Sequence, residues 1–156
     1  MRSPFLIPLS LGAATPTITE YSVPTANSQP WGIAAGPDGA IWFTEDQKIG
    51  RITTSGAITE YPVATGNDYL NAIAAGPDGA LWFVTGQGSK IGRISTSGTI
   101  TLYSAPNGGN SSNQIMGIVA GSDGALWFAE AYANKIGRIT TAGVVTEYAA
   151  PGSQPS

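Results

Sequence analysis

Few side chains in this sequence could take part in acid–base or metal chemistry. The 156 residues include seven lysines and arginines and ten aspartates and glutamates, but no cysteine and no histidine. Without cysteine there are no disulfides, thiolate nucleophiles or thiolate metal ligands. Without histidine the chain lacks the side chain that most often acts as a general base or metal ligand near neutral pH. Such chemistry would therefore depend mainly on carboxylates.

Charge and hydropathy exclude two classes of partner. The net charge is −3, whereas a nucleic-acid-binding domain carries a basic patch or stripe. No apolar stretch approaches the roughly 20 residues that a membrane-spanning helix requires. We therefore expect neither a nucleic acid nor a membrane as partner, and the open class is a small-molecule ligand.

Most of the charges recur at fixed spacing, which first suggests structural roles for them. Six of the seven basic residues belong to three KIGRI segments, which begin at Lys48, Lys90 and Lys135. Arg51 and Glu60 flank a TTSG turn, and Arg138 and Glu147 flank the corresponding turn of the third copy. In an antiparallel pair this spacing predicts a cross-strand ion pair. Leu102 replaces the acid in the second copy, so the pair would not be indispensable.

A unit of roughly 42 residues is repeated three times, a period typical of stacked repeat architectures. GPDGAIWF at Gly36 returns as GPDGALWF at Gly76 and as GSDGALWF at Gly121, and each copy continues into KIGRI and an ITEY-like segment. Pro-Asp-Gly favours a tight turn, because proline presets its backbone angle and glycine accepts a positive one. Each copy therefore predicts four short strands joined by turns.

The second strand of each copy is apolar on both faces, with Ile41 and Phe43 on one side and Trp42 on the other. Such a strand must be covered on both sides. Four-stranded antiparallel sheets that need a neighbour on each face are typical of β-propeller blades. We therefore predict an all-β fold with three blades, at about 31–63, 72–105 and 117–149. We also expect residues 1–16 to be a leader or weak signal-like segment, 18–23 an extra outer strand and 150–156 a tail.

The variation in length between the copies gathers at one rim of the predicted propeller. The distance from KIGRI to the following ITEY-like segment is constant, whereas the second loop and the inter-blade connection vary. Variable loops on a rigid scaffold are common binding sites, and loops rich in Asn, Ser and Gly suit recognition. The loops concerned are 22–29, 64–71 and 104–114, with Asp46, Gln87 and Tyr132, and Tyr132 is a predicted ligand contact.

Three blades leave two apolar sheet faces uncovered, and patches of that size are rarely exposed in a monomer. Two chains could close a six-bladed ring about a two-fold axis, and the strand at 18–23 could then be exchanged into the partner's last blade. Alternatively, the chain is a fragment of a longer propeller. The sequence predicts a homodimer or a fragment.

The first residues, MRSPFLIPLSLGAA, combine one basic residue with a short apolar run and small residues at its end. This pattern resembles a weak secretory signal peptide, although Pro4 and Pro8 interrupt it. The alternative is a leader without a targeting role. Both a secreted and a cytoplasmic location remain open.

The segments GPDGAIWFTE and KIGRITTSGAITEYP, repeated from Ile18 to Tyr148, resemble the streptogramin (virginiamycin B) lyase family. The resemblance implies a seven-bladed propeller, of which this chain would hold three blades. It also implies a carbon–oxygen lyase that inactivates streptogramin B antibiotics by opening their lactone ring through elimination. The family uses a histidine base and a magnesium ion held by acidic residues on the loop face.

The resemblance also points to site residues. Glu45 and Glu130 follow the WF-x motif where metal ligands would lie, and oxygen ligands suit Mg²⁺. The family repeats often have histidine just before the first strand. Here that position is held by Trp31, Asn71 and Met116, which are predicted to contact the substrate.

Three functions remain open from the sequence. None of the residues before the first strand is a base, and removing a proton next to a carbonyl requires one. A glutamate could serve if burial raised its pKa. The first function is a binding module whose variable rim recognises a small ligand. The second is an authentic Mg-dependent streptogramin B lyase that acts when assembled. The third is a metal-dependent lactone hydrolase similar to gluconolactonases.

Overall fold

The computed structural model describes residues 15–66, 68–87, 90–106 and 114–151, in which twelve β-strands form three four-stranded antiparallel sheets. Blade 1 contains β1 (Ile33–Ala35), β2 (Ile41–Thr44), β3 (Lys48–Ile52) and β4 (Ile58–Pro62). Blade 2 contains β5 (Leu70–Ala75), β6 (Leu81–Thr85), β7 (Lys90–Ile94) and β8 (Ile100–Ser104). Blade 3 contains β9 (Ile115–Ala120), β10 (Ala125–Glu130), β11 (Lys135–Thr140) and β12 (Val145–Ala149). The described residues include no helix with the length and apolarity to cross a membrane.

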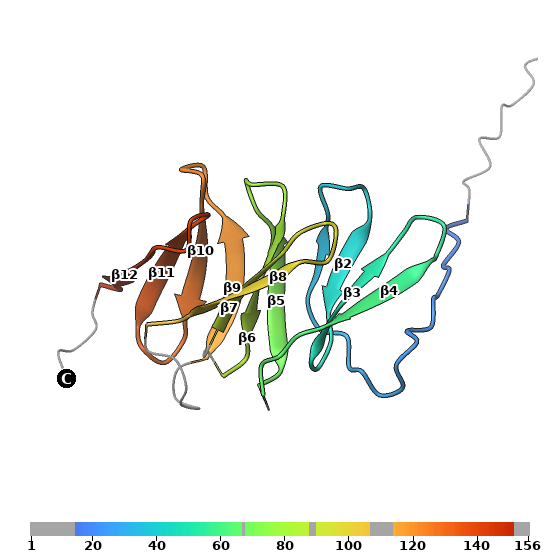
Figure 1. Ribbon diagram of the computed structural model, residues 1–156, viewed down its shortest axis with the longest axis horizontal. Helices are drawn as coiled ribbons and strands as arrows, with labels where there is room; N and C mark the ends of the chain where they lie inside the picture. Colours follow the sequence, from blue (N-terminus) through green and yellow to red (C-terminus); the bar gives the residue numbers. More distant parts are fainter. Residues whose placement is uncertain (1–14, 67, 88–89, 107–113, 152–156) are drawn as a thin grey trace, which may run out of the picture.

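The blades stand side by side and do not close into a ring (Figure 1). Within each blade successive strands are hydrogen-bonded neighbours, and β5 lies between β1 and β9. The turns after β1, β5 and β9 stand along the upper edge in Figure 1. The all-β partial propeller is thus confirmed. β5 and β9 begin at Leu70 and Ile115, two residues before the blade limits expected from the sequence.

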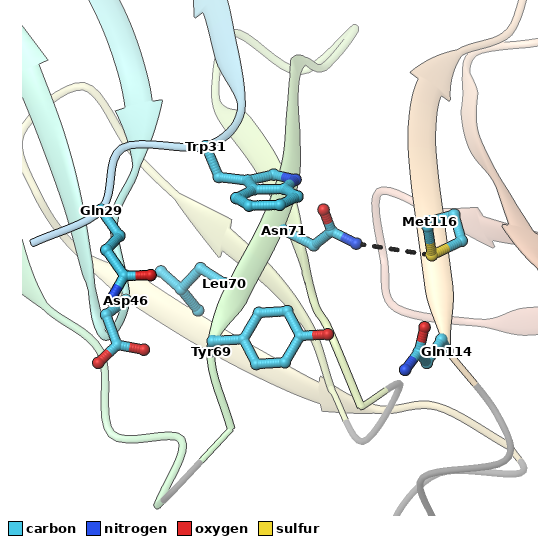
Figure 2. Close-up of a pocket in the computed structure, with 8 residues that line it drawn as sticks. All are labelled: Gln29, Trp31, Asp46, Tyr69, Leu70, Asn71, Gln114 and Met116. Atoms are coloured by element: carbon cyan, nitrogen blue, oxygen red, sulfur yellow. Dashed lines mark hydrogen bonds between the residues drawn. The ribbon is translucent and has the colours of Figure 1, made fainter.

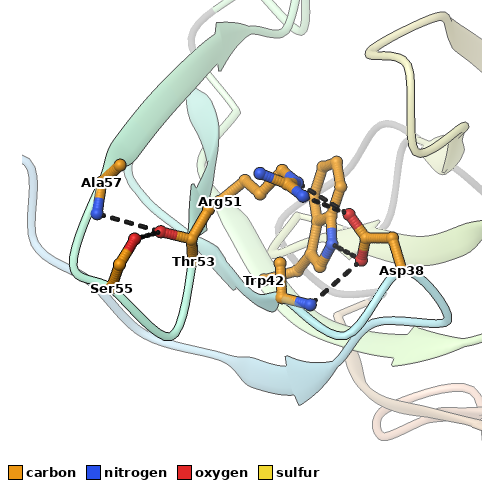
Figure 3. A network of polar contacts seen from close by, with 7 residues as sticks. Asp38, Trp42, Arg51, Thr53, Ser55 and Ala57 are labelled. Atoms are coloured by element: carbon orange, nitrogen blue, oxygen red, sulfur yellow. Dashed lines mark hydrogen bonds and ion pairs between the residues drawn. The ribbon is translucent and has the colours of Figure 1, made fainter.

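The aspartate of each GPDG-type turn accepts hydrogen bonds from two strands of its blade. Asp38 accepts hydrogen bonds from Trp42 Nε1 at 3.0 Å and from Arg51 Nε at 2.7 Å (Figure 3). Partial burial alone would raise the pKa of Asp38, but the bonds from Trp42 and Arg51 lower it below the ordinary value. Trp42 also stacks on Tyr61 of β4 with ring centroids 5.7 Å apart. This arrangement recurs around Asp78 and Asp123.

The predicted ion pair between Arg51 and Glu60 is wrong. In the β3–β4 register Gly50 faces Glu60 and Arg51 faces Thr59, so an offset of one residue places the two charges on opposite faces of the sheet. Glu60 instead pairs with Lys48, whose Nζ lies 2.7 Å from Oε2.

The corresponding prediction for the third copy is wrong for the same reason, because Gly137 faces Glu147. Glu147 pairs with Lys135 at 2.7 Å, and Arg138 pairs with Asp123 at 2.7 Å. In blade 2, where no glutamate stands at this position, Lys90 donates to Ser104 Oγ at 3.1 Å.

Apolar side chains fill the space between neighbouring blades. In each contact, the tryptophan side of one blade meets the phenylalanine side of the next. Blades 1 and 2 bury Trp42 and Ile49 against Ile73, Leu81, Phe83 and Ile94. Blades 2 and 3 bury Trp82, Val84 and Ile91 against Ile118, Leu126, Phe128 and Ile139. Blade 2 is therefore covered on both faces, whereas blades 1 and 3 are each covered on the face that meets blade 2.

Residues 18–23 do not form the extra outer strand expected from the sequence, since the structure assigns no strand there. Tyr21 nevertheless lies against Gly56, where a Cβ would come within 2.3 Å of its ring. The same contact joins Tyr61 to Gly98 and Tyr103 to Gly143. The segment thus occupies the place of a fourth strand of a preceding blade without pairing as one. The signal-like residues 1–14 lie outside the described residues.

Candidate functional site

A cavity of about 310 Å³ opens at the rim that carries the variable loops (Figure 2). Its walls come from the segment before β1, the β2–β3 loop, the start of β5 and the start of β9. The lining residues are Gln29, Trp31, Asp46, Tyr69, Leu70, Asn71, Gln114 and Met116. The cavity therefore draws on all three blades, at the end where the sequence analysis predicted recognition.

Three of the four predicted ligand contacts meet in this cavity, because Trp31, Asn71 and Met116 occupy the same position in successive repeats. Trp31 is 73% exposed and Met116 is 55% exposed, whereas Asn71 between them is only 6% exposed. The Asn71 side-chain amide donates to the Ile115 carbonyl at 3.1 Å and lies 4.0 Å from Met116 Sδ (Figure 2). The buried amide thus fixes blade 2 to blade 3 and leaves two large apolar side chains at the surface.

Hydrogen bonds between blades hold the walls of this cavity in place. Thr44 Oγ1 donates to the Asn71 carbonyl at 2.6 Å and accepts from the Gly32 amide at 2.7 Å. The Leu70 amide donates to the Asp46 carbonyl at 2.9 Å, and the Asp46 amide donates to the Ser28 carbonyl at 2.8 Å. The Trp31, Asp46 and Asn71 segments are therefore positioned by the backbone, independently of any ligand.

Sequence reasoning did not single out Gln29, Tyr69 and Gln114 as contacts. They lie in the predicted recognition loops, and their proximity to Trp31 follows only from the packing of the blades. The Tyr69 ring lies where a Cβ on Gly86 would come within 1.9 Å of it, so that glycine provides the space for the ring. Tyr132, the fourth predicted contact, is exposed in the β10–β11 turn and does not line this cavity.

Glu45 is a buried acid beside the cavity. It is 1% exposed, and neither carboxylate oxygen has a hydrogen-bond partner of ordinary geometry in the described part of the chain. Burial raises the pKa of Glu45 above its ordinary value, and the nearby Ser28 and Lys48 oppose this effect. Glu45 lines a second cavity of about 290 Å³, which shares Asp46 with the first.

Glu130, the second predicted metal ligand, is also buried, at the end of β10 opposite Lys135 of β11. In the residues that the structure describes, no three acids come close enough together to hold a metal ion. The magnesium ion that the family resemblance implies therefore stays a prediction.

Comparison with known proteins agrees with this architecture. The model of the virginiamycin B lyase family matches residues 12–155. The structure superposes on selenomethionine-substituted virginiamycin B lyase from Staphylococcus aureus with a TM-score of 0.81 and 47% identity, over 86% of this chain and 46% of that one. A second structure, of a streptogramin B lyase, gives a TM-score of 0.79 and 44% identity, over 85% of this chain and 44% of that one.

A third structure connects the family with a ligand. It holds a catalytically inactive histidine-to-alanine variant of the Staphylococcus aureus enzyme with quinupristin, and it matches with a TM-score of 0.82 and 47% identity over 88% of this chain and 46% of that one. The chain thus spans less than half the length of the lyases it matches. A gluconolactonase from Xanthomonas campestris shares the fold alone, with a TM-score of 0.60 and 16% identity, over 78% of this chain and 47% of that one.

The family model covers nearly the whole sequence, and the three-blade architecture agrees with the lyase structures. The chain belongs to the virginiamycin B lyase family.

Proposed function

We propose that the rim cavity of this virginiamycin B lyase-like propeller binds a small ligand with an apolar or aromatic face. The exposed pair Trp31 and Met116, held on either side of buried Asn71, carries the proposal. A chemical precedent is quinupristin, the compound present with the inactive variant of the related lyase.

The surface of the cavity suits such a ligand. Ligand pockets combine apolar and aromatic walls with a few polar groups that fix orientation. Here Trp31, Met116 and Tyr69 supply apolar surface, while Gln29 and Gln114 supply amide groups at the edge. Pockets range from roughly 300 to 1,000 Å³, so a cavity of about 310 Å³ would hold one ring or side chain of a larger ligand.

We expect binding without turnover. A general base must lie within hydrogen-bond reach of the proton it removes. The sequence has no histidine, and among the described residues that line the cavity Asp46 is the only carboxylate. The inactive variant of the related lyase has lost a histidine, which supports the expectation that this chain recognises but does not open a lactone.

Tryptophan fluorescence tests the binding proposal. Trp31 is the most exposed of the chain's four tryptophans, since Trp42 and Trp82 are fully buried and Trp127 is half-buried. Titration with quinupristin should change the emission in a saturable way. Replacing Trp31 with alanine should remove this signal and weaken binding measured by calorimetry about tenfold or more, which corresponds to about 1.4 kcal/mol.

Two control variants separate a specific site from a general effect. Trp31→Phe keeps an aromatic ring and should retain most of the calorimetric affinity while losing the fluorescence response. Tyr132→Ala removes an exposed aromatic residue outside the cavity and should change neither measurement. No saturable binding by the wild-type chain up to millimolar quinupristin would end the proposal, as would equal losses in the Trp31→Ala and Tyr132→Ala variants.

A second candidate function is elimination by this chain itself, and buried Glu45 is the observation that favours it. In this reaction a base takes a proton from the carbon next to a carbonyl, the ester carbon–oxygen bond breaks, and a carboxylate and a carbon–carbon double bond result. A carboxyl group whose pKa is raised by burial is a stronger base than an exposed one. Glu45 has such a pKa and lies beside the main cavity.

Product analysis separates the candidates. Incubation with quinupristin and Mg²⁺ at pH 6–9 would yield a ring-opened product of unchanged mass if elimination occurs. A lactone hydrolase would add one water to the product. Activity of the wild-type chain that disappears in Glu45→Gln and persists in Asp46→Asn would establish Glu45 as the base. If neither the product of unchanged mass nor the product with one added water forms, only the binding function is supported.

A further inference from the structure

The charge of the rim cavity comes from Asp46 alone among the described residues that line it. Asp46 belongs to the β2–β3 loop, and the described lining residues include no lysine or arginine. Asp46 is exposed, so its carboxylate is open to a ligand. The sign of this charge favours a cationic ligand and disfavours an anionic one.

The basic side chains of the described residues have other partners. Lys48 lies two residues beyond Asp46, but its Nζ is 2.7 Å from Oε2 of Glu60. The other basic side chains of the KIGRI segments follow the same pattern: Arg51, Arg93, Lys135 and Arg138 each pair with an acid of their own blade, and Lys90 donates to Ser104. In the part of the chain that the structure describes, the Asp46 carboxylate therefore has no ion-pair partner.

Backbone hydrogen bonds hold Asp46 and Tyr69 in place at this cavity. The Asp46 carbonyl accepts from the Leu70 amide at 2.9 Å, and Tyr69 is the residue before Leu70. The Tyr69 carbonyl in turn accepts from the Gly86 amide at 2.8 Å. Asp46 belongs to blade 1 and Tyr69 to blade 2, so their relative position is set by the contact between these blades and not by an outer face of the array.

Aromatic rings and a thioether complete the surroundings of this carboxylate. Figure 2 shows the rings of Trp31 and Tyr69 between Asp46 on one side and Met116 on the other. The face of an aromatic ring attracts a cation, and cages of aromatic residues recognise quaternary ammonium groups. The sulfur of methionine is polarizable and adapts to apolar ligands. A carboxylate together with two aromatic rings therefore suits an ammonium group whose carbon substituents are apolar.

We propose that the rim cavity selects ligands that carry an alkylated ammonium group, and that Asp46 determines this selectivity. The inference rests on the proposed binding function, because it concerns the ligand of the same cavity. The positive charge interacts with the Asp46 carboxylate, while the methyl or methylene groups on the nitrogen pack against Trp31 and Tyr69. A carboxylate or phosphate on the ligand would instead meet Asp46 as a like charge and be repelled.

Two probes of the same shape and different charge test this selectivity. Choline carries a quaternary nitrogen, and dimethylbutanol is its neutral analogue with carbon in place of that nitrogen. NMR follows binding through the indole N–H signal of Trp31, which is assigned by its absence in Trp31→Phe. The wild-type chain should bind choline about fivefold more tightly than dimethylbutanol, as expected for an exposed ion pair. Added salt should reduce this preference, because it screens exposed charges.

Three variants identify the residue responsible. Asp46→Asn removes the charge and keeps the backbone bonds of the loop, so it should bind choline about fivefold more weakly than the wild type and dimethylbutanol equally well. Asp46→Glu should retain the preference for choline. Glu20→Gln is the matched control, because it changes the net charge by the same amount at an exposed residue that does not line the cavity. It should bind both probes like the wild type.

The outcomes separate this inference from the proposed function. Equal affinities of the wild-type chain for the two probes would overturn the selectivity for a cation, as would equal losses of choline binding in Asp46→Asn and Glu20→Gln. A Trp31 signal that responds to neither probe would also overturn it. In each of these cases saturable binding of quinupristin that depends on Trp31 would still support the proposed function, whereas its absence would end both.

Discussion

Gly92→Ala should destabilise the chain because Gly92 leaves room for a buried ring. A Cβ at this position of β7 would lie 2.0 Å from Cζ of Phe83. Phe83 is fully buried between blades 1 and 2. Protein interiors are close-packed, so the ring has no free space to enter. The added methyl group must therefore distort the interface between the two blades.

The repeat provides a matched control at Gly50. A Cβ there would lie 2.1 Å from Phe43, almost the same approach. Phe43, however, is on the outer face of blade 1 and borders the open cavity of about 560 Å³. Its ring can move outward, so the same substitution should cost much less at Gly50.

The magnitudes follow from packing and backbone entropy. Overpacking a core costs about 1–3 kcal/mol, and alanine in place of glycine within a strand recovers roughly 0.5–1 kcal/mol. Gly92→Ala should thus lose about 1–2 kcal/mol, while Gly50→Ala should be close to neutral. For a chain of this size each kcal/mol lowers Tm by about 2–4 °C, so Gly92→Ala should melt about 2–8 °C lower than Gly50→Ala.

Thermal and urea unfolding followed by circular dichroism measure this difference. Each substitution is made singly in the otherwise unchanged chain. Gly137→Ala, beneath buried Phe128, should behave like Gly92→Ala. Equal losses at Gly50 and Gly92 would refute the reasoning, because they would show that a free outer face does not relieve the contact.

Three further outcomes follow from the polar contacts. Burial would raise the pKa of Asp78, but the bonds from Arg93 and Trp82 lower it below its ordinary value of 3.8. The contribution of Asp78 to stability is therefore present above roughly pH 4 and lost as pH falls through the folded-state pKa. In Asp78→Asn the unfolding free energy should therefore decrease less at acid pH than it does in the wild type. The pKa of Glu45 is raised, so the pH dependence of its contribution to stability is the reverse of that of Asp78. This contribution is present below the unfolded-state pKa of about 4.5 and is lost as pH rises. Glu45→Gln should therefore be more stable than wild type at pH 7 and about equal to it at pH 4. Asn71→Ala leaves the Ile115 carbonyl without the amide that binds it and should cost about 1–3 kcal/mol in urea unfolding.

The blade architecture could be predicted from the sequence because it depends on local patterns. Alternating apolar residues around Trp42 require cover on both faces of the strand, and the GPDG turns set the strand order. The grouping of Trp31, Asn71 and Met116 could also be predicted, because equivalent positions of stacked repeats become neighbours. In each case the position of a residue in the fold follows from its position in the repeat.

The ion pairs could not be assigned from spacing alone. Whether Arg51 or Lys48 meets Glu60 depends on a register offset of one residue, which moves a side chain to the other face of the sheet. The TTSG turn predicts that β3 and β4 pair, but the partner of each charge follows from the register that the folded sheet adopts.

The sequence by itself determined that there are three β-blades and which side chains lie on each of their two faces, because both follow from the repeat and its alternation of side chains. The tertiary structure decided which charges pair, that Tyr132 stands apart from the rim cavity, and that Glu45 is buried with a raised pKa. These properties depend on atoms contributed by several segments distant in the chain. These atoms come close to one another only when the blades pack.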